Sequence, residues 1–189
     1  QGQEFGMTNF PFTDAKQLRA DEIKKKYEML LTELSANQAL AEVTQNSREH
    51  SRTPMQWDNS KNAGFTSGQA WMEINPNFSV INSQTNQELI ELYKKLIELR
   101  HQEPAISEGS IKFHFKRHPQ VLVYERAEFL IIVNLADKKA HLDFTNIDSF
   151  TDSSAESSVI NYQQVLGSSN QKFQEKMVLS AWEYQVYKK

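Results

Sequence analysis

The run from Arg48 to Asp58 (REHSRTPMQWD) concentrates side chains that can bind a polar ligand. Arg48 and Arg52 lie four residues apart and lead into Thr53-Pro54, where a helix cannot continue. A guanidinium presents planar, paired donors that suit a carboxylate or two neighbouring sugar hydroxyls. Arginines can equally brace a surface loop, so residue chemistry leaves both interpretations open and assigns no reaction to this candidate binding loop.

Other side chains give weaker signals. Hydrolysis of a glycosidic bond uses two carboxylates held about 5–10 Å apart, and the sequence does not place Glu4 and Asp58 together; each alone suits a loop hydrogen-bond acceptor. Trp57 and Trp71 suit either a sugar-stacking surface or an anchor for their loop. The five histidines form no metal-ligand pattern, and His114 is expected at the surface. We therefore predict no metal site and no cofactor in this chain, and residue chemistry alone names no catalytic residue.

Composition narrows the class of protein. The 189 residues, 39% of them hydrophobic, suit one large domain or one domain with an appendage. The net charge of −3 argues against a nucleic-acid partner. No apolar run approaches the ~20 residues that cross a membrane. Without cysteine or a signal-peptide pattern, we predict a cytoplasmic location. The first residues, Gln1–Gly6, resemble the middle of a sequence motif. We therefore expect this chain to be a piece of a longer protein.

Helical periodicity dominates the first part of the chain. The spacing of apolar residues predicts a helix over 21–34, with a continuation or a second short helix over 36–43. The stretch 46–82 shows no sustained period and is expected to be a long, irregular loop. Over 87–103 apolar residues recur at three and four, which predicts a core-packing helix closed by Pro104.

After Gly109 the apolar period changes to two, beginning with Ile111, Phe113 and Phe115. A Ser/Asp-rich loop is expected over 148–158. Short strands separated by turns favour an antiparallel sandwich of Greek-key type. The predicted strands cover 111–115, 121–125, 129–135, 140–144, 159–166, 177–179 and 182–187.

Several motifs occur in a fixed order along the chain. They are Gln1–Asn9 (QGQEFGMTN), Ser47–Asp58 (SREHSRTPMQWD), Lys61–Thr66 (KNAGFT) and Asn75–Asn77 (NPN), followed by Tyr93–Arg100 (YKKLIELR) and Trp182–Tyr184 (WEY). Together they resemble glycoside hydrolase family 13, in particular the group of oligo-1,6-glucosidase, dextran glucosidase and trehalose-6-phosphate hydrolase. The resemblance covers nearly the whole chain and is loosest over 14–45 and the β part.

The resemblance implies an α+β fold in two domains. Residues 1–107 would form the helical end of a (β/α)8 barrel, its last βα unit, and residues 108–189 an antiparallel β-sandwich. The family's catalytic carboxylates lie on earlier strands, so this C-terminal portion is expected to be inactive by itself. The intact protein would be a retaining, exo-acting α-glucosidase acting on isomalto- or malto-oligosaccharides.

The resemblance also implies substrate-binding residues. Arg48 matches an arginine that helps hold the non-reducing glucose, and Arg52 matches a second arginine that braces the loop. Glu22 is the candidate for a glutamate near the leaving sugar, although Asp21-Glu22-Ile23 departs from the usual Asp-Ile-Glu. Glu49-His50 likewise departs from the usual Asp-Asn.

Three alternatives stay open. The parent protein would be a trehalose-6-phosphate hydrolase, or the β part would be a non-catalytic carbohydrate-binding module. In the third alternative the chain is a structural or interaction domain. A separated barrel unit would then expose an apolar face on residues 1–80 and self-associate through it.

Overall fold

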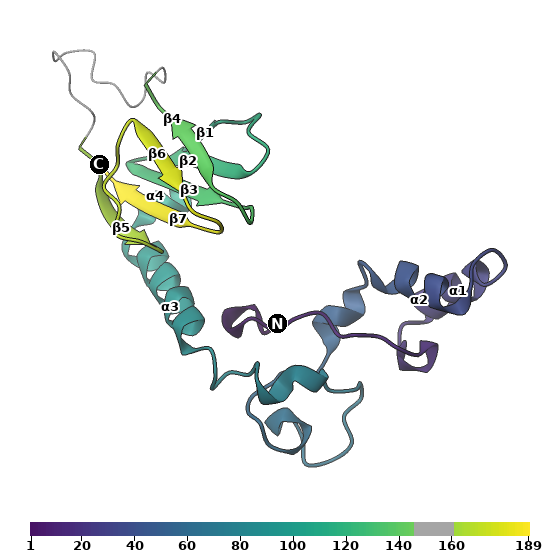
Figure 1. Ribbon diagram of the computed structural model, residues 1–189. Coiled ribbons are helices and arrows are strands. Elements are labelled where there is room, and N and C mark those ends of the chain that lie inside the picture. Colours follow the sequence, from purple (N-terminus) through teal and green to yellow (C-terminus); the bar gives the residue numbers. More distant parts are fainter. Residues whose placement is uncertain (146–160) are drawn as a thin grey trace. The chain divides into compact units, whose positions relative to one another are not determined.

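The computed structural model describes residues 1–145 and 161–189 (Figure 1). The chain divides into two compact units, Gln1–Ile97 and Glu98–Lys189, and each is described by itself. The domain division after residue 107 stays a prediction. Within the described ranges, no helix combines the length and apolar character that crossing a membrane requires.

A helical hairpin forms the core of the first unit. Helix α1 (Asp21–Leu30) ends four residues before the predicted boundary at Leu34, and α2 (Ala36–Thr44) is a separate helix. The break occurs because Ser35 takes an extended conformation and forms a capping box with Gln38, which starts a new helix. The two helices lie side by side (Figure 1) around a small apolar cluster of Leu18, Leu40 and Val43, against which Phe12, Ala15, Ile23, Tyr27 and Leu30 pack.

Single turns of 3-10 helix interrupt the loops of this unit. The predicted irregular segment 46–82 contains three of them, so it is ordered locally although it has no sustained period. Such short turns use i→i+3 hydrogen bonds and suit segments that change direction often. They are η1 (Gln3–Phe5), η2 (Ala15–Gln17), η3 (Arg48–Arg52), η4 (Lys61–Gly64) and η5 (Pro76–Ser79).

The tryptophan loop (residues 57–68) closes on itself. The backbone N–H groups of Trp57 and Asp58 donate to the carbonyl oxygen of Ala63 at 2.9 and 3.3 Å. Asn62 and Ala63 both adopt left-handed conformations, with φ of 56° and 54°. The Asn62 side-chain amide donates to two further carbonyl oxygens of the loop, at 2.9 and 2.8 Å. Asparagine tolerates the left-handed conformation. At Ala63 the same conformation is strained, and the hydrogen bonds of the loop offset the cost.

Helix α3 (Gln87–Gln102) confirms the predicted helix but not the predicted burial. None of its side chains is buried, and Leu96 and Ile97 of its apolar stripe are exposed. Pro104 ends α3 as expected and also starts a further short helix, α4 (Pro104–Glu108). Proline is suited to that first position because its missing N–H would have no helical partner there.

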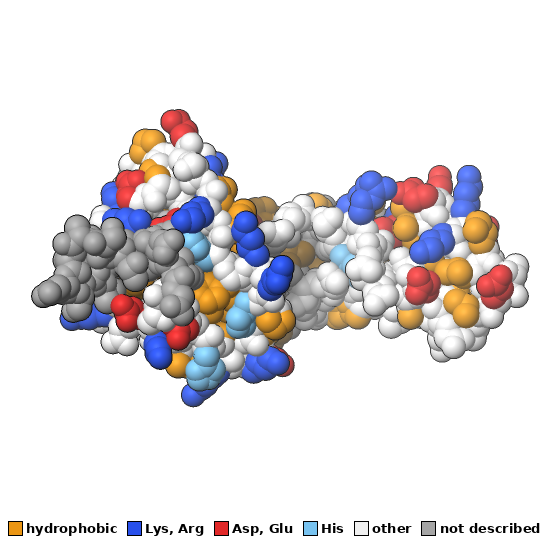
Figure 2. All heavy atoms as spheres, turned by 90° about the horizontal axis from the view of Figure 1, so that it is seen from above, with side chains coloured by type: hydrophobic (Ala, Val, Ile, Leu, Met, Phe, Trp, Pro, Cys, Tyr) orange, Lys and Arg blue, Asp and Glu red, His pale blue; other side chains and the backbone are white. Residues whose placement is uncertain are grey.

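Other apolar side chains of the first unit are exposed as well. Hydrophobic side chains lie among charged ones on the visible face of the α1–α2 hairpin (Figure 2). The exposed large hydrophobic residues within 1–80 are Met29, Leu31, Trp57, Phe65, Trp71 and Val80.

Two antiparallel sheets build the second unit, as predicted. One sheet has the order β1-β2-β3-β7-β5, and the other pairs β4 with β6. After β3 the chain alternates between the sheets, with β4 and β6 in the second and β5 and β7 in the first, where β7 pairs with β3. The strands are β1 (Ile111–His114), β2 (Val121–Arg126), β3 (Phe129–Asn134), β4 (Ala140–Asp143), β5 (Gln163–Gly167), β6 (Lys176–Leu179) and β7 (Tyr184–Lys188). The loop predicted over 148–158 and the start of the strand predicted over 159–166 lie outside the described residues.

The core of this unit lies between the two sheets. Buried aromatic rings meet edge-to-face there, which is a favoured arrangement of aromatic pairs; Phe144 and Phe173 have ring centroids 5.2 Å apart. The buried cluster draws on strands of both sheets and consists of Val123, Leu130, Ile132, Leu142, Phe144, Tyr162, Phe173, Met177, Leu179 and Tyr187. The predicted antiparallel β-rich part is therefore confirmed, and both of its sheets contribute to one core.

In strand β1 the hydrophobic side chain of Phe113 points to solvent, and the polar side chain of His114 is buried. Phe113 is 48% exposed, whereas His114 is 8% exposed and faces inward. The expectation that His114 is a surface histidine is wrong. Its ring Nε2 lies 3.0 Å from Oε2 of Glu125 on the neighbouring strand, so a polar partner makes burial of the imidazole possible.

Glu125 gathers three partners inside the sandwich. Besides His114, the hydroxyl of Tyr162 and Nζ of Lys189 each donate to Oε1 at 3.0 Å. Burial raises the pKa of the Glu125 carboxyl, but hydrogen bonds from Lys189 and His114 outweigh it and leave the pKa below the ordinary value of 4.5. We call these four residues the Glu125 cluster.

Candidate functional site

Helix η3 carries both candidate arginines. The side chain of Ser47 accepts a hydrogen bond from the backbone N–H of Glu49 at 3.2 Å and caps the turn at its start. Thr53, which precedes a proline, is extended and ends it. The sequence thus confines Arg48 and Arg52 to a short, capped turn.

Arg48 contacts Glu22 of α1, 26 positions earlier in the chain. Nη2 of Arg48 lies 2.7 Å from Oε1 of Glu22, and the two side chains are 74% and 59% exposed. The backbone N–H of Glu22 at the helix start, and then the Arg48 guanidinium, lower the pKa of the Glu22 carboxyl. The charge of Arg52 acts in the same direction. The three predicted substrate-binding residues therefore lie in one neighbourhood, with Arg48 and Glu22 in direct contact.

Glu49 follows Arg48 in the chain and is 1% exposed. Its Oε1 accepts hydrogen bonds from the backbone N–H groups of Arg19 and Ala20, both at 2.5 Å. Oε2 is also buried, and no donor from the described part of the chain reaches it. Sequence reasoning registered Glu49 as a departure from a family pattern and gave it no role.

His50 ties two further segments to η3. The backbone N–H of Phe10 donates to Nδ1 at 3.1 Å, and Nε2 lies 2.7 Å from the carbonyl oxygen of Thr44. A carbonyl oxygen only accepts, so we assign the ring hydrogen to Nε2 and a neutral imidazole to His50. The ring also packs against Phe12, with centroids 5.3 Å apart.

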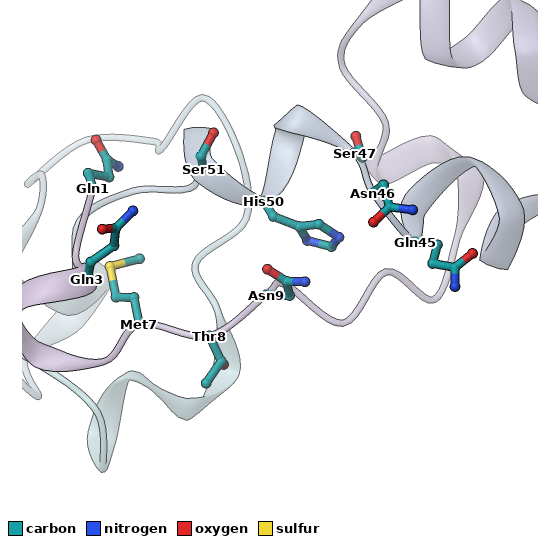
Figure 3. A pocket seen from close by; sticks show the side chains of 10 residues that line it. All are labelled: Gln1, Gln3, Met7, Thr8, Asn9, Gln45, Asn46, Ser47, His50 and Ser51. Atoms are coloured by element: carbon teal, nitrogen blue, oxygen red, sulfur yellow. The ribbon is translucent and has the colours of Figure 1, made fainter. Parts of the chain in front are cut away.

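A polar pocket of about 360 Å³ adjoins His50. Figure 3 shows His50 between the segment that carries Thr8 and Asn9 and the end of α2. Its lining contains no Asp, Glu, Lys or Arg side chain: amides and hydroxyls predominate, among them Gln1, Gln3, Asn9, Gln45 and Asn46. Such a lining suits an uncharged ligand rich in hydroxyl groups.

The remaining candidates lie apart from this pocket. Asp58 accepts a hydrogen bond from the backbone N–H of Ser60 at 2.8 Å, and hydrogen bonding by Ser60 lowers the pKa of the Asp58 carboxyl. It is therefore a turn acceptor, as one interpretation held. Trp57 and Trp71 are both exposed. Over 1–145 and 161–189, no three His, Cys, Asp or Glu side chains are grouped as a metal site would require.

Comparison with known proteins relates the chain to a large enzyme family. The model described as "Alpha amylase, catalytic domain" matches residues 1–109. The probable oligo-1,6-glucosidase 2 of Bacillus subtilis is 39% identical over 132 residues, which are 67% of this chain and 24% of that protein. The trehalose-6-phosphate hydrolase of the same organism is 34% identical over 142 residues, 71% of this chain and 25% of that protein. The chain thus spans about a quarter of these relatives.

A solved structure is similar to this chain. An isomaltulose synthase variant from Erwinia rhapontici, in complex with D-glucose, superposes with a TM-score of 0.83 at 31% identity. The match covers 100% of this chain and 34% of that one.

Proposed function

Because the chain belongs to the alpha-amylase family, family 13 of the glycoside hydrolases, we propose that it supplies part of the sugar-binding wall of an α-glucosidase. The intact protein would hydrolyse short α-glucosides such as isomalto- or malto-oligosaccharides, from the non-reducing end and with retention. Two carboxylates about 5–5.5 Å apart carry out such a reaction. These carboxylates would come from other parts of the intact protein. We also propose that the intact protein is cytoplasmic.

The Arg48–Glu22 pair is the observation that carries this proposal. One nitrogen of the Arg48 guanidinium contacts Glu22, while the side chain stays 74% exposed. A guanidinium has five N–H donors, so donors remain for the hydroxyls of a bound glucose. Arg48 would position the sugar, Glu22 would face the leaving sugar, and Arg52 would brace the loop.

The expected contribution of Arg48 is positioning. In a bound substrate, an error of about 1 Å at the reacting atoms can lower a rate on the order of 100-fold. We therefore expect Arg48→Ala in the full-length enzyme to lower kcat/KM for p-nitrophenyl α-glucoside about 100-fold. Because Arg48 is exposed, Tm should stay nearly unchanged. Arg100→Ala, which removes an exposed arginine on α3, is the matched control. An unchanged kcat/KM in Arg48→Ala would overturn the proposal.

The substrate of the intact enzyme could be an uncharged oligosaccharide or a phosphorylated disaccharide. One relative is a trehalose-6-phosphate hydrolase, and a phosphorylated sugar calls for cationic side chains around the phosphate. The charge of Arg48 is paired with Glu22, and the lining of the polar pocket contains no Lys or Arg side chain, so we propose an uncharged oligosaccharide. Comparing kcat/KM for isomaltose and for trehalose 6-phosphate tests this choice. A preference for the phosphorylated sugar would contradict it.

A further inference from the structure

The Arg48–Glu22 pair does not fix its own geometry. Both side chains are more than half exposed, and solvent competes with an ion pair of that kind. Each side chain also has many rotamers, so the pair alone would sample several arrangements. The fixed spacing of the two charges must come from the backbones that carry them.

A buried contact joins those two backbones next to the pair. Glu49 follows Arg48 directly, and its carboxylate holds the N–H groups of Arg19 and Ala20 at 2.5 Å. Ala20 is the N-cap residue of α1, two positions before Glu22, and its methyl side chain cannot accept a hydrogen bond. The Glu49 carboxylate, from a distant part of the chain, therefore acts as the anion at the start of α1.

We propose that Glu49 is a positioning residue that sets the distance between Arg48 and Glu22 and so shapes the site for the two sugar units around the scissile bond. This inference rests on the proposed function of Arg48. It assigns Glu49 an effect exerted through its neighbour, without contact between Glu49 and the substrate. A purely structural carboxylate would stabilise α1 without acting through Arg48.

A double-mutant cycle in the full-length enzyme separates these two roles. Glu49→Gln removes the charge and keeps the size of the side chain, and Arg48→Ala removes the group through which Glu49 is proposed to act. We expect Glu49→Gln alone to lower kcat/KM at least 10-fold, and to lower it less than 3-fold in the Arg48→Ala background. Equal losses in both backgrounds would overturn the proposal. Glu42→Gln, an exposed carboxylate on α2, is the control.

Two further measurements test the role of Glu49 without relying on enzyme activity. In the wild-type protein the amides of Arg19 and Ala20 should exchange slowly with solvent hydrogen, and in Glu49→Gln they should exchange at least 10-fold faster. A crystal structure of Glu49→Gln should show Arg48 displaced from Glu22. An intact Arg48–Glu22 contact in that structure would overturn the inference, whether or not Arg48 binds sugar. An unchanged kcat/KM in Arg48→Ala would instead refute the proposed function.

If Glu49→Gln does not fold, Glu49→Asp takes its place in the cycle. Aspartate keeps the charge on a side chain one carbon shorter, so the segment at Arg19 and Ala20 must move to meet it. The same coupling to Arg48→Ala is expected, and an equal loss in both backgrounds contradicts positioning here too.

Discussion

Removing the carboxylate of Glu125 should destabilise the β unit strongly. Glu125→Ala deletes the hydrogen bonds from His114 and Tyr162, both buried, and from the more exposed Lys189. A hydrogen bond to a charged group contributes about 1.5–3 kcal/mol. Counting only the two buried donors at the lower value, we expect a loss of about 3 kcal/mol in the free energy of unfolding. That corresponds to roughly a 100-fold larger fraction of unfolded β unit.

Amide hydrogen exchange measures this loss where it occurs. The amides of β2 and β3, which are central in the five-stranded sheet, exchange only when the unit opens. We expect them to exchange roughly 100-fold faster in Glu125→Ala, and unchanged in the control Glu108→Gln, which alters an exposed carboxylate on α4. Exchange less than threefold faster would show that the Glu125 cluster does not hold the sandwich together.

The same carboxylate predicts a pH dependence. The pKa of Glu125 is lower in the folded protein than its ordinary value of 4.5. Its contribution is therefore fully present above pH 4.5 and is lost as the pH falls through the lower, folded pKa. The difference in unfolding free energy between wild type and Glu125→Ala should stay constant from about pH 7 to 5 and narrow below that range. A difference that widened on acidification would refute this account.

Two further predictions concern buried phenols and exposed apolar side chains. Burial raises the pKa of Tyr162 and of Tyr187, so absorbance at about pH 11 should show fewer than all six tyrosines ionised while the protein is folded. The stability that these phenols contribute is present below about pH 10 and is lost above it, and full titration of folded protein at pH 11 would contradict this. Light scattering of the 189-residue chain should show mass increasing with concentration, less so in Trp71→Ser/Val80→Ser, because both residues are exposed. A monomer at high concentration would contradict self-association.

Local sequence patterns predicted where helices and strands occur more accurately than which of their side chains are buried. Each predicted strand overlaps an observed one, and their ends differ by at most two described residues, since alternation and turns are local signals. His114 reversed the expected face of β1, because its partner Glu125 lies on the next strand and alternation carries no information about pairing. The break between α1 and α2 was present in the sequence as the capping pair Ser35 and Gln38.

The candidate site depended still more on contacts between distant residues. The roles of Arg48 and Glu22 were predictable only through a family resemblance, and their contact spans 26 positions. The side-chain hydrogen bonds of Glu49 and His50 span 29 to 40 positions, with the exception of the contact between His50 and Thr44. Such contacts are set by how α1, α2 and η3 meet, and no periodicity within one segment contains them.

The tryptophan loop has a consequence for the order of folding events. Its closing hydrogen bonds join residues at most six positions apart, from Trp57 to Ala63 and from Asn62 to Gly68. Closing a loop of about ten residues takes roughly 10–100 ns, far less than pairing of distant strands. The segment after Arg52 can therefore acquire its shape early and present a preformed surface to parts of the protein that assemble later.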